Sequence, residues 1–119
     1  MEVKQAIQEM VDMIQQGKAM DAFEKFYAEN VVMQENQEAP REGKTTNREY
    51  EEKFFGNVAD VHEIKAHTIA VEGNKSMVEW TFDVTMKDGN RMKMEQVAVQ
   101  TWENDQIIRE RFYYNKPSQ

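Results

Sequence analysis

The period of the apolar residues changes near Gly56, and this change constrains the fold more than any other feature of the sequence. Before it, apolar side chains recur at the spacings of amphipathic helices. From residue 64 onwards they alternate with polar side chains, which is typical of strands. Helices followed by a run of strands predict an α+β fold with the helices packed on an antiparallel sheet. Because 119 residues lie near the common size of one domain, we expect residues 1–119 to form a single domain.

Three helices are expected in the first half of the chain. The first is predicted over residues 3–16, and Gly17 suits the left-handed backbone that often follows a helix end. A second helical pattern follows and reaches Tyr27. Thr46 and Glu49 have the spacing of a capping box, so the third helix is predicted to begin there. The charged run that follows, residues 49–53, is interpreted as a solvated helix face.

Five strands are expected, one before the third helix and four after it. The first covers residues 31–35, where β-branched and apolar residues follow the helix hairpin. Turn signals separate the later strands, and Asp88 with Gly89 is the strongest of them. The later strands are predicted at residues 64–72, 77–86, 91–102 and 106–114. Residues 116–119 are predicted to form a frayed tail.

Alternation along strand 91–102 predicts which residues share a face. Val97 and Val99 belong to one face of this strand. The other face is expected to carry Met92, Met94, Gln96, Ala98, Gln100 and Trp102. Because apolar residues occur on both faces, both are expected to be covered. Helices would cover one face, and a second copy of the chain would cover the other, which predicts a homodimer.

Several segments together resemble the SnoaL-like branch of the NTF2-like superfamily, which has the ketosteroid isomerase-like, or cystatin-like, cone fold. The residues that carry the resemblance are Tyr27, Ala28, Glu29 and Asn30 at the first turn, Gly43 and Lys44 before the third helix, and the closing segment 102–113. The resemblance implies three N-terminal helices packed on a curved antiparallel sheet around a cone-shaped pocket. It also implies binding of a small hydrophobic molecule and, in the catalytic members, proton transfer of the isomerase, cyclase or lyase type without a cofactor.

The resemblance also implies roles for individual residues. Glu35 falls on the position of the general base of the isomerases. Met10 and Ala98 fall on the positions of their two oxyanion donors, and neither side chain can donate a hydrogen bond. The sequence therefore argues against a steroid isomerase, although a carboxylate at residue 35 is suited to moving protons.

A second carboxylate, Glu110, is expected to face the same pocket. In the frame that places Ala98 inside, alternation points Glu110 inward, and the two carboxylates could form an acid and base pair. In the alternative interpretation Glu110 pairs with Arg109 or Arg111 or lies at a wet rim. The pocket is expected to be lined by Met10, Ile14, Tyr27, Met33, Trp80, Phe82, Gln96, Ala98, Gln100, Trp102 and Phe112. Met and aromatic residues could equally be ordinary core filling, which would leave a non-catalytic ligand-binding or dimeric interaction module.

Charge and composition guide the choice of partners. The formal net charge is −7, from 15 Lys and Arg against 22 Asp and Glu, and the basic residues are interleaved with acids. We therefore expect no nucleic-acid partner and no binding to an anionic membrane. The N-terminus lacks the pattern of a signal peptide, and no apolar run approaches the roughly 20 residues needed to span a bilayer, so a cytoplasmic protein is expected.

No metal site is expected. The chain has no Cys, and its two His residues, His62 and His67, are an odd number of positions apart. In a regular strand they would face opposite sides, so only one of them could reach the pocket. Neither has a third ligand at a suitable spacing.

Overall fold

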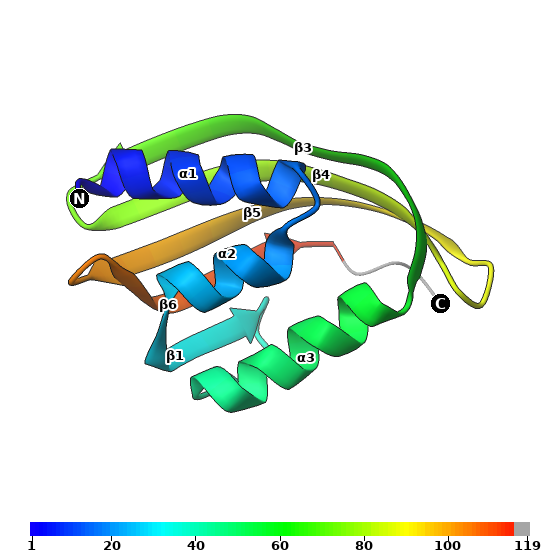
Figure 1. The fold of residues 1–119 in the computed structure, drawn as a ribbon, viewed down its shortest axis with the longest axis horizontal. Helices are drawn as coiled ribbons and strands as arrows, with labels where there is room; N and C mark the ends of the chain where they lie inside the picture. Colours follow the sequence, from blue (N-terminus) through cyan, green and yellow to red (C-terminus); the bar gives the residue numbers. More distant parts are fainter. Residues whose placement is uncertain (116–119) are drawn as a thin grey trace.

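The computed structural model describes residues 1–115, and in it three helices lie on one face of a six-stranded sheet (Figure 1). The helices are α1 (Val3–Gln15), α2 (Ala19–Phe26) and α3 (Lys44–Gly56). The strands are β1 (Tyr27–Glu35), β2 (Arg41–Glu42), β3 (Val58–Glu72), β4 (Lys75–Met86), β5 (Arg91–Glu103) and β6 (Gln106–Tyr114). The tail predicted at residues 116–119 lies outside the described residues.

The sheet has the strand order β2-β1-β6-β5-β4-β3. All neighbouring pairs are antiparallel except β1 and β6, which run parallel. The long strands β3, β4 and β5 bend around the helices (Figure 1). The predicted α+β fold, with three N-terminal helices on a curved and mostly antiparallel sheet, is confirmed. Through this parallel pair, β1, the strand that follows α2, lies beside β6, the last strand of the chain.

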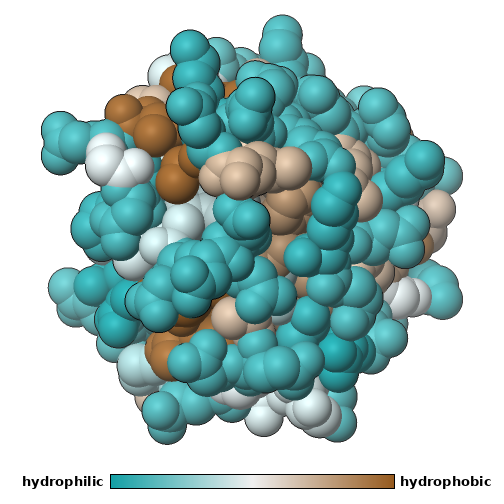
Figure 2. Space-filling model, turned by 60° about the vertical axis from the view of Figure 1, so that its left-hand side comes forward, coloured by the Kyte–Doolittle hydropathy of each residue, from teal (hydrophilic) through white to brown (hydrophobic). Residues whose placement is uncertain are grey.

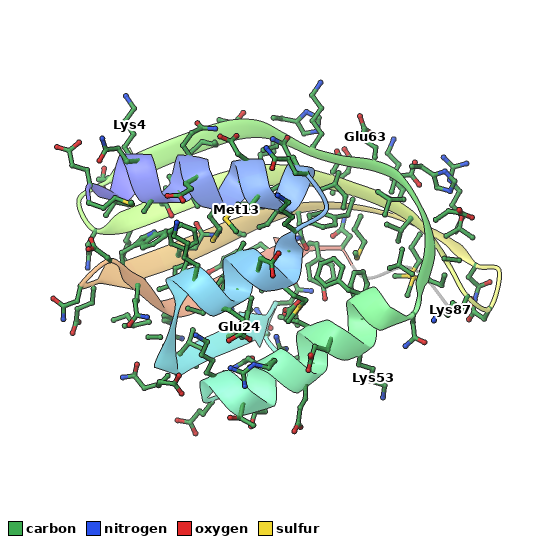
Figure 3. All side chains as sticks on the ribbon, in the orientation of Figure 1. Lys4, Met13, Glu24, Lys53, Glu63 and Lys87 are labelled. Carbon is green, nitrogen blue, oxygen red and sulfur yellow. The ribbon has the colours of Figure 1, made fainter. Side chains whose placement is uncertain are left out.

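Helix α1 follows the sequence prediction closely. Glu2 and Gln5 form a capping box at its start, and Gly17 adopts a φ of 82° two residues after its end. Its apolar face is buried at Ala6, Ile7, Met10 and Val11. In Figure 3, Lys4 projects away from the body of the molecule, whereas Met13 lies on the side of α1 that faces α2.

Two helix boundaries differ from the prediction. Helix α2 ends at Phe26, and Tyr27 is already the first residue of β1. Helix α3 begins at Lys44 after Gly43, which has a φ of 93°, so the predicted capping box at Thr46 is wrong. The Gly43 carbonyl accepts hydrogen bonds from both the backbone and the side chain of Asn47, and these bonds fix the earlier start. The buried Lys44 ammonium donates to the Glu24 carbonyl at 2.9 Å and ties α3 to α2.

Strand β3 begins six residues before its predicted start and contains irregularities that change which side chains share a face. Its register with β4 shifts between Val61 and Glu63 and again between Ala66 and Thr68. His62 contacts Thr85 and His67 contacts Thr81, each through Nε2 and the threonine Oγ1 at 2.7 Å. Alternation therefore gave a wrong prediction for the two His residues. Both lie on the face that carries Thr81 and Thr85, opposite the helices.

Buried apolar residues from α1, α2 and the inner face of the sheet form one core. On β4 the buried apolar residues are Val78, Trp80, Phe82 and Val84, every second residue along the strand. The face shown in Figure 2 is mainly hydrophilic, with separate apolar areas. Among residues 1–115, no helix combines the length and the apolar composition needed to cross a membrane.

Candidate functional site

A cavity of about 420 Å³ lies between the inner face of the sheet and the three helices. This volume falls in the range of small-molecule sites. Ten residues that the sequence places in the pocket line it: Met10, Ile14, Tyr27, Met33, Glu35, Trp80, Phe82, Gln96, Glu110 and Phe112. Their roles in binding or catalysis stay predictions. The other lining residues are Ala19, Met20, Ala22, Phe23, Glu38, Tyr50, Glu51, Phe54, Phe55, Met92, Met94 and Tyr114.

Three predicted pocket residues lie elsewhere. Ala98 is fully buried in the core, and Gln100 is fully buried with its amide bonded to Glu110. Trp102 packs edge-to-face on Phe26 and donates its indole N–H to Ser76 Oγ at 2.8 Å. The expectation that Trp102 forms part of the pocket wall is therefore wrong. It lies at the far end of β5, where the register with β6 shifts, and the helices are packed directly against this end.

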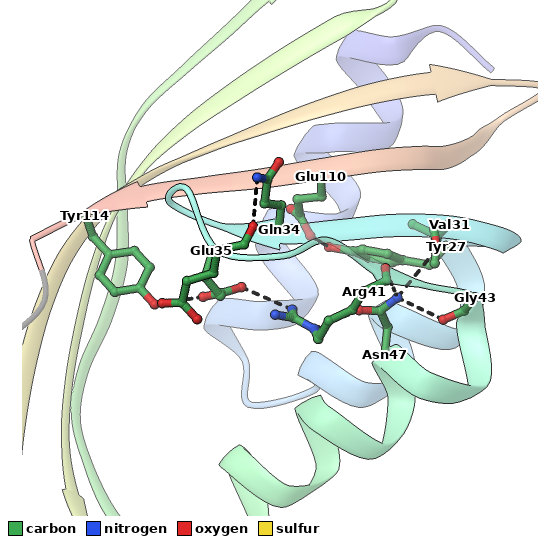
Figure 4. Close-up of polar contacts among 10 residues, drawn as sticks. Tyr27, Val31, Gln34, Glu35, Arg41, Gly43, Asn47, Glu110 and Tyr114 are labelled. Carbon is green, nitrogen blue, oxygen red and sulfur yellow. Dashed lines mark hydrogen bonds and ion pairs between the residues drawn. The ribbon is translucent and has the colours of Figure 1, made fainter.

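Glu35 is the last residue of β1 and reaches the cavity between two donors. Arg41 of β2 contacts one carboxylate oxygen through Nη2 at 3.1 Å, and Tyr114 of β6 donates its hydroxyl to the other at 2.9 Å (Figure 4). Arg41 also donates through Nε to Asn47 Oδ1 at 3.1 Å and stacks on the Tyr50 ring, with 3.6 Å from Cζ to the ring centroid. The 9% exposed Glu35 is thus oriented by neighbours from β2 and β6.

Glu110 lies beside Met33 across the parallel β1–β6 pair and is 2% exposed. It accepts hydrogen bonds from the Tyr27 hydroxyl and from Gln100 Nε2, the latter at 2.6 Å. The alternative in which Glu110 pairs with Arg109 or Arg111 or lies at a wet rim is therefore wrong. Burial raises the pKa of Glu110 to about 7, against the opposing effect of its two donors. Burial, followed by the nearby Glu110, also raises the pKa of Tyr27 well above its usual value.

Glu51 of α3 is a wall residue that the sequence interpretation missed. It was assigned to a solvated helix face, but it lines the cavity. Removal from water raises the pKa of its carboxyl to about 8, and the charges of Glu110 and Glu35 add to the effect. The signal for this placement was its spacing: Glu51 lies four residues after the fully buried Asn47 and four before Phe55, on one helix face.

The described residues show no candidate metal centre. Within residues 1–115, no three His, Asp or Glu side chains are grouped so that they could hold a metal ion. Both His residues lie outside the lining of the cavity. The polar side chains of the cavity wall carry carboxyl, hydroxyl and amide groups.

The fold and the cavity agree with a comparison with known protein families. The model of the SnoaL-like domain family matches residues 1–114, so the chain belongs to this family. The resemblance inferred from the sequence is thereby confirmed. No significant match was found among curated proteins.

Solved structures show the same fold. A SnoaL-like polyketide cyclase candidate from Mesorhizobium loti superposes with a TM-score of 0.86 at 29% identity, over 96% of this chain and 100% of that one. A polyketide cyclase candidate from Pseudomonas putida gives 0.77 at 19% identity, over 97% and 92%. An epoxide hydrolase from M. tuberculosis gives 0.75 at 17% identity, over 93% and 80%. The last two likenesses establish the fold alone, because different reactions share it.

Proposed function

We propose that the cavity binds a small hydrophobic organic molecule and that Glu35 moves a proton on it without a cofactor. The observation that carries this proposal is the position of the Glu35 carboxylate, which reaches an otherwise largely apolar cavity from the end of a strand. Reactions of the isomerase, cyclase or lyase type need such a base beside a bound substrate.

Two neighbours hold the Glu35 carboxyl in place beside the cavity. Arg41 contacts one of its oxygens, and the Tyr114 hydroxyl donates to the other. The carboxylate would accept a proton from a carbon of the ligand and return it to another atom of the same ligand. Glu110 would be the second titrating group, because burial brings its pKa to about 7.

A second candidate function is non-catalytic binding. It is favoured because each oxygen of the Glu35 carboxyl already accepts a hydrogen bond from a protein donor. In that case Glu35, Arg41 and Tyr114 would hold β1, β2 and β6 together, and the cavity would only carry its ligand. A cytoplasmic location and the lack of nucleic-acid or membrane partners stay predictions of the sequence.

The Glu35→Gln variant separates these two functions. Exchange of the acidic C–H protons of β-tetralone, a small bicyclic ketone, can be followed by NMR in deuterated water. If Glu35 is the base, the protein accelerates exchange and the variant loses roughly 10²–10⁴ of the acceleration. Tyr114→Phe is the matched control, because it removes one donor and keeps the carboxylate. Equal exchange by Glu35→Gln and the wild type, with both folded by circular dichroism, would leave only the binding function.

We also propose that the outer face of the sheet forms a homodimer. Val97 and Tyr113 are paired across β5 and β6 on that face and are 38% and 44% exposed, and Met77 on β4 is 39% exposed. Covering these residues would remove apolar surface from water. Val97→Glu should give a monomer in light scattering at micromolar concentration. Val61→Glu is the control, since this exposed valine pairs with Val84 and lies outside the group. A monomeric wild type would contradict the proposal.

A further inference from the structure

We propose that the ligand is a hydrophobic amine that binds as its cation, with the ammonium group at Glu51. This inference rests on the proposed function of the cavity and names the chemical class of its ligand. It is carried by the charges on the cavity wall, by the lack of a partner for Glu51 and by the aromatic residues around it.

The ionisable groups of the cavity wall are mostly acids. Within residues 1–115, four carboxyl groups line the cavity, those of Glu35, Glu38, Glu51 and Glu110, and no Lys or Arg lines it. Arg41 contacts two residues of the cavity wall, Glu35 and Tyr50. Its guanidinium is taken up by Glu35, Asn47 and the Tyr50 ring. Arg41 thus forms its direct ion pair with Glu35.

Two of the remaining carboxyl groups have no cationic partner in the part of the chain that the structure describes. Glu110 accepts only from the neutral Tyr27 and Gln100. Glu51 makes no hydrogen bond or ion pair with any residue between 1 and 115. The Glu51 side chain is only partly buried, and its oxygens can be reached from the cavity, since no fully buried side-chain oxygen among residues 1–115 lacks a partner. A ligand that fills the cavity would take this carboxyl out of water, which is costly unless the ligand supplies a partner. A ligand ammonium would supply that partner to Glu51 and would also lie in the field of Glu110.

The rest of the wall suits the apolar part of such a ligand. Tyr50, Phe54 and Phe55 of α3 flank Glu51 in sequence and line the same cavity. Trp80 and Phe82 of β4 lie on the opposite wall. Aromatic faces attract cations as well as apolar rings, most strongly where water is excluded. A carboxylate ligand would instead meet an acidic wall that has no Lys or Arg among the described residues.

The pH dependence of binding distinguishes a cation from a neutral ligand. The groups that act on Glu51 are Glu110 and Glu35, which favour its neutral form, and Arg41, which opposes them. With a pKa of about 8, Glu51 is mostly protonated at pH 7 in the empty cavity. An ammonium needs the ionised form, so its affinity should rise by up to about tenfold per pH unit towards pH 8. A neutral hydrogen-bond acceptor needs the protonated form and should bind more weakly as pH rises.

The test uses three probes with the same skeleton: phenylbutylamine, phenylbutanol and phenylbutyrate. Calorimetry at pH 6, 7 and 8 measures their affinities and the protons released. The amine stays charged over this range because its own pKa is about 10. We expect the amine to bind roughly 10- to 100-fold more tightly than the alcohol at pH 8, to gain affinity from pH 6 to pH 8 and to release protons. The acid should bind most weakly.

The Glu51→Gln variant should abolish the preference for the amine while keeping the affinity for the alcohol. Glu52→Gln is the matched control, because Glu52 is its exposed neighbour on the same helix, and this change should preserve the preference. Equal or tighter binding of the alcohol, or a preference that survives Glu51→Gln, would overturn the inference but leave the cavity as a binding site. If none of the probes binds, both the inference and the proposed binding of hydrophobic molecules fail.

Discussion

The inner face of the sheet has two ends that follow the same alternation but differ in what covers them. Along β5, Met92, Met94 and Gln96 border the cavity, whereas Ala98 and Gln100 are packed without exposure. We call these the open end and the closed end. The closed end also contains Trp102 and contacts the start of α1 and the end of α2. The open end faces the end of α1, the start of α2 and the second half of α3.

The two ends differ in how their polar side chains are hydrogen-bonded. At the closed end they form a continuous chain, in which Trp102 donates to Ser76, Ser76 to Gln100, and Gln100 to Glu110. At the open end Glu51 has no partner among residues 1–115. The buried polar groups of the closed end already have partners, whereas Glu51 is only partly buried and borders the cavity, where a ligand can reach it.

The largest effect is expected from Gln100→Leu at the closed end. This change would leave the Ser76 hydroxyl without its acceptor and Glu110 without one of its two donors, all of them buried. Each unsatisfied buried group costs about 1–3 kcal/mol, so we expect a loss of roughly 3 kcal/mol in the free energy of unfolding. Urea denaturation followed by circular dichroism measures it.

Gln96→Leu makes the same chemical change at the open end and is the matched control. Gln96 lies on the same row of β5 but borders the cavity, where water can reach it. We expect its free energy of unfolding to stay within about 1 kcal/mol of the wild type. Equal losses for the two variants would remove the distinction between the ends.

The fold was largely predictable from the sequence because its signals are local. Period, turn residues and the closing segment 102–113 gave the three helices and five of the six strands in order, and the last strand, Gln106–Tyr114, to the residue. The two-residue strand β2 was not predicted. The start of β3 was missed because residues 58–63 are mostly exposed and show no alternation. The positions of His62 and His67 were missed because register shifts reverse the side that alternation assigns.

The candidate site was predictable on the strands and at Met10 and Ile14 of α1, but not on α3. Alternation and the family resemblance placed Glu35 and Glu110 towards one cavity, and the structure brings them there. The same reasoning could not show where the cavity ends, because that depends on how the helices close over Gln100 and Trp102. Glu51 was missed for a related reason. A charged run on a helix predicts a solvated face, and only the packing of the neighbouring elements shows that Glu51 borders the cavity.

A smaller effect, in fluorescence, tests where the cavity stops. Trp80 lines the cavity and packs edge-to-face on Phe82 at 5.3 Å between ring centroids, whereas Trp102 lies at the closed end. A probe such as phenylbutylamine should therefore change the emission of the Trp102→Phe variant, in which Trp80 is the sole tryptophan. It should leave the emission of Trp80→Phe nearly unchanged, because the remaining indole is held by Phe26 and Ser76 away from the ligand. A response of similar size in both variants, with the fold of each verified by circular dichroism, would mean that ligand reaches the closed end and that the two ends form one site.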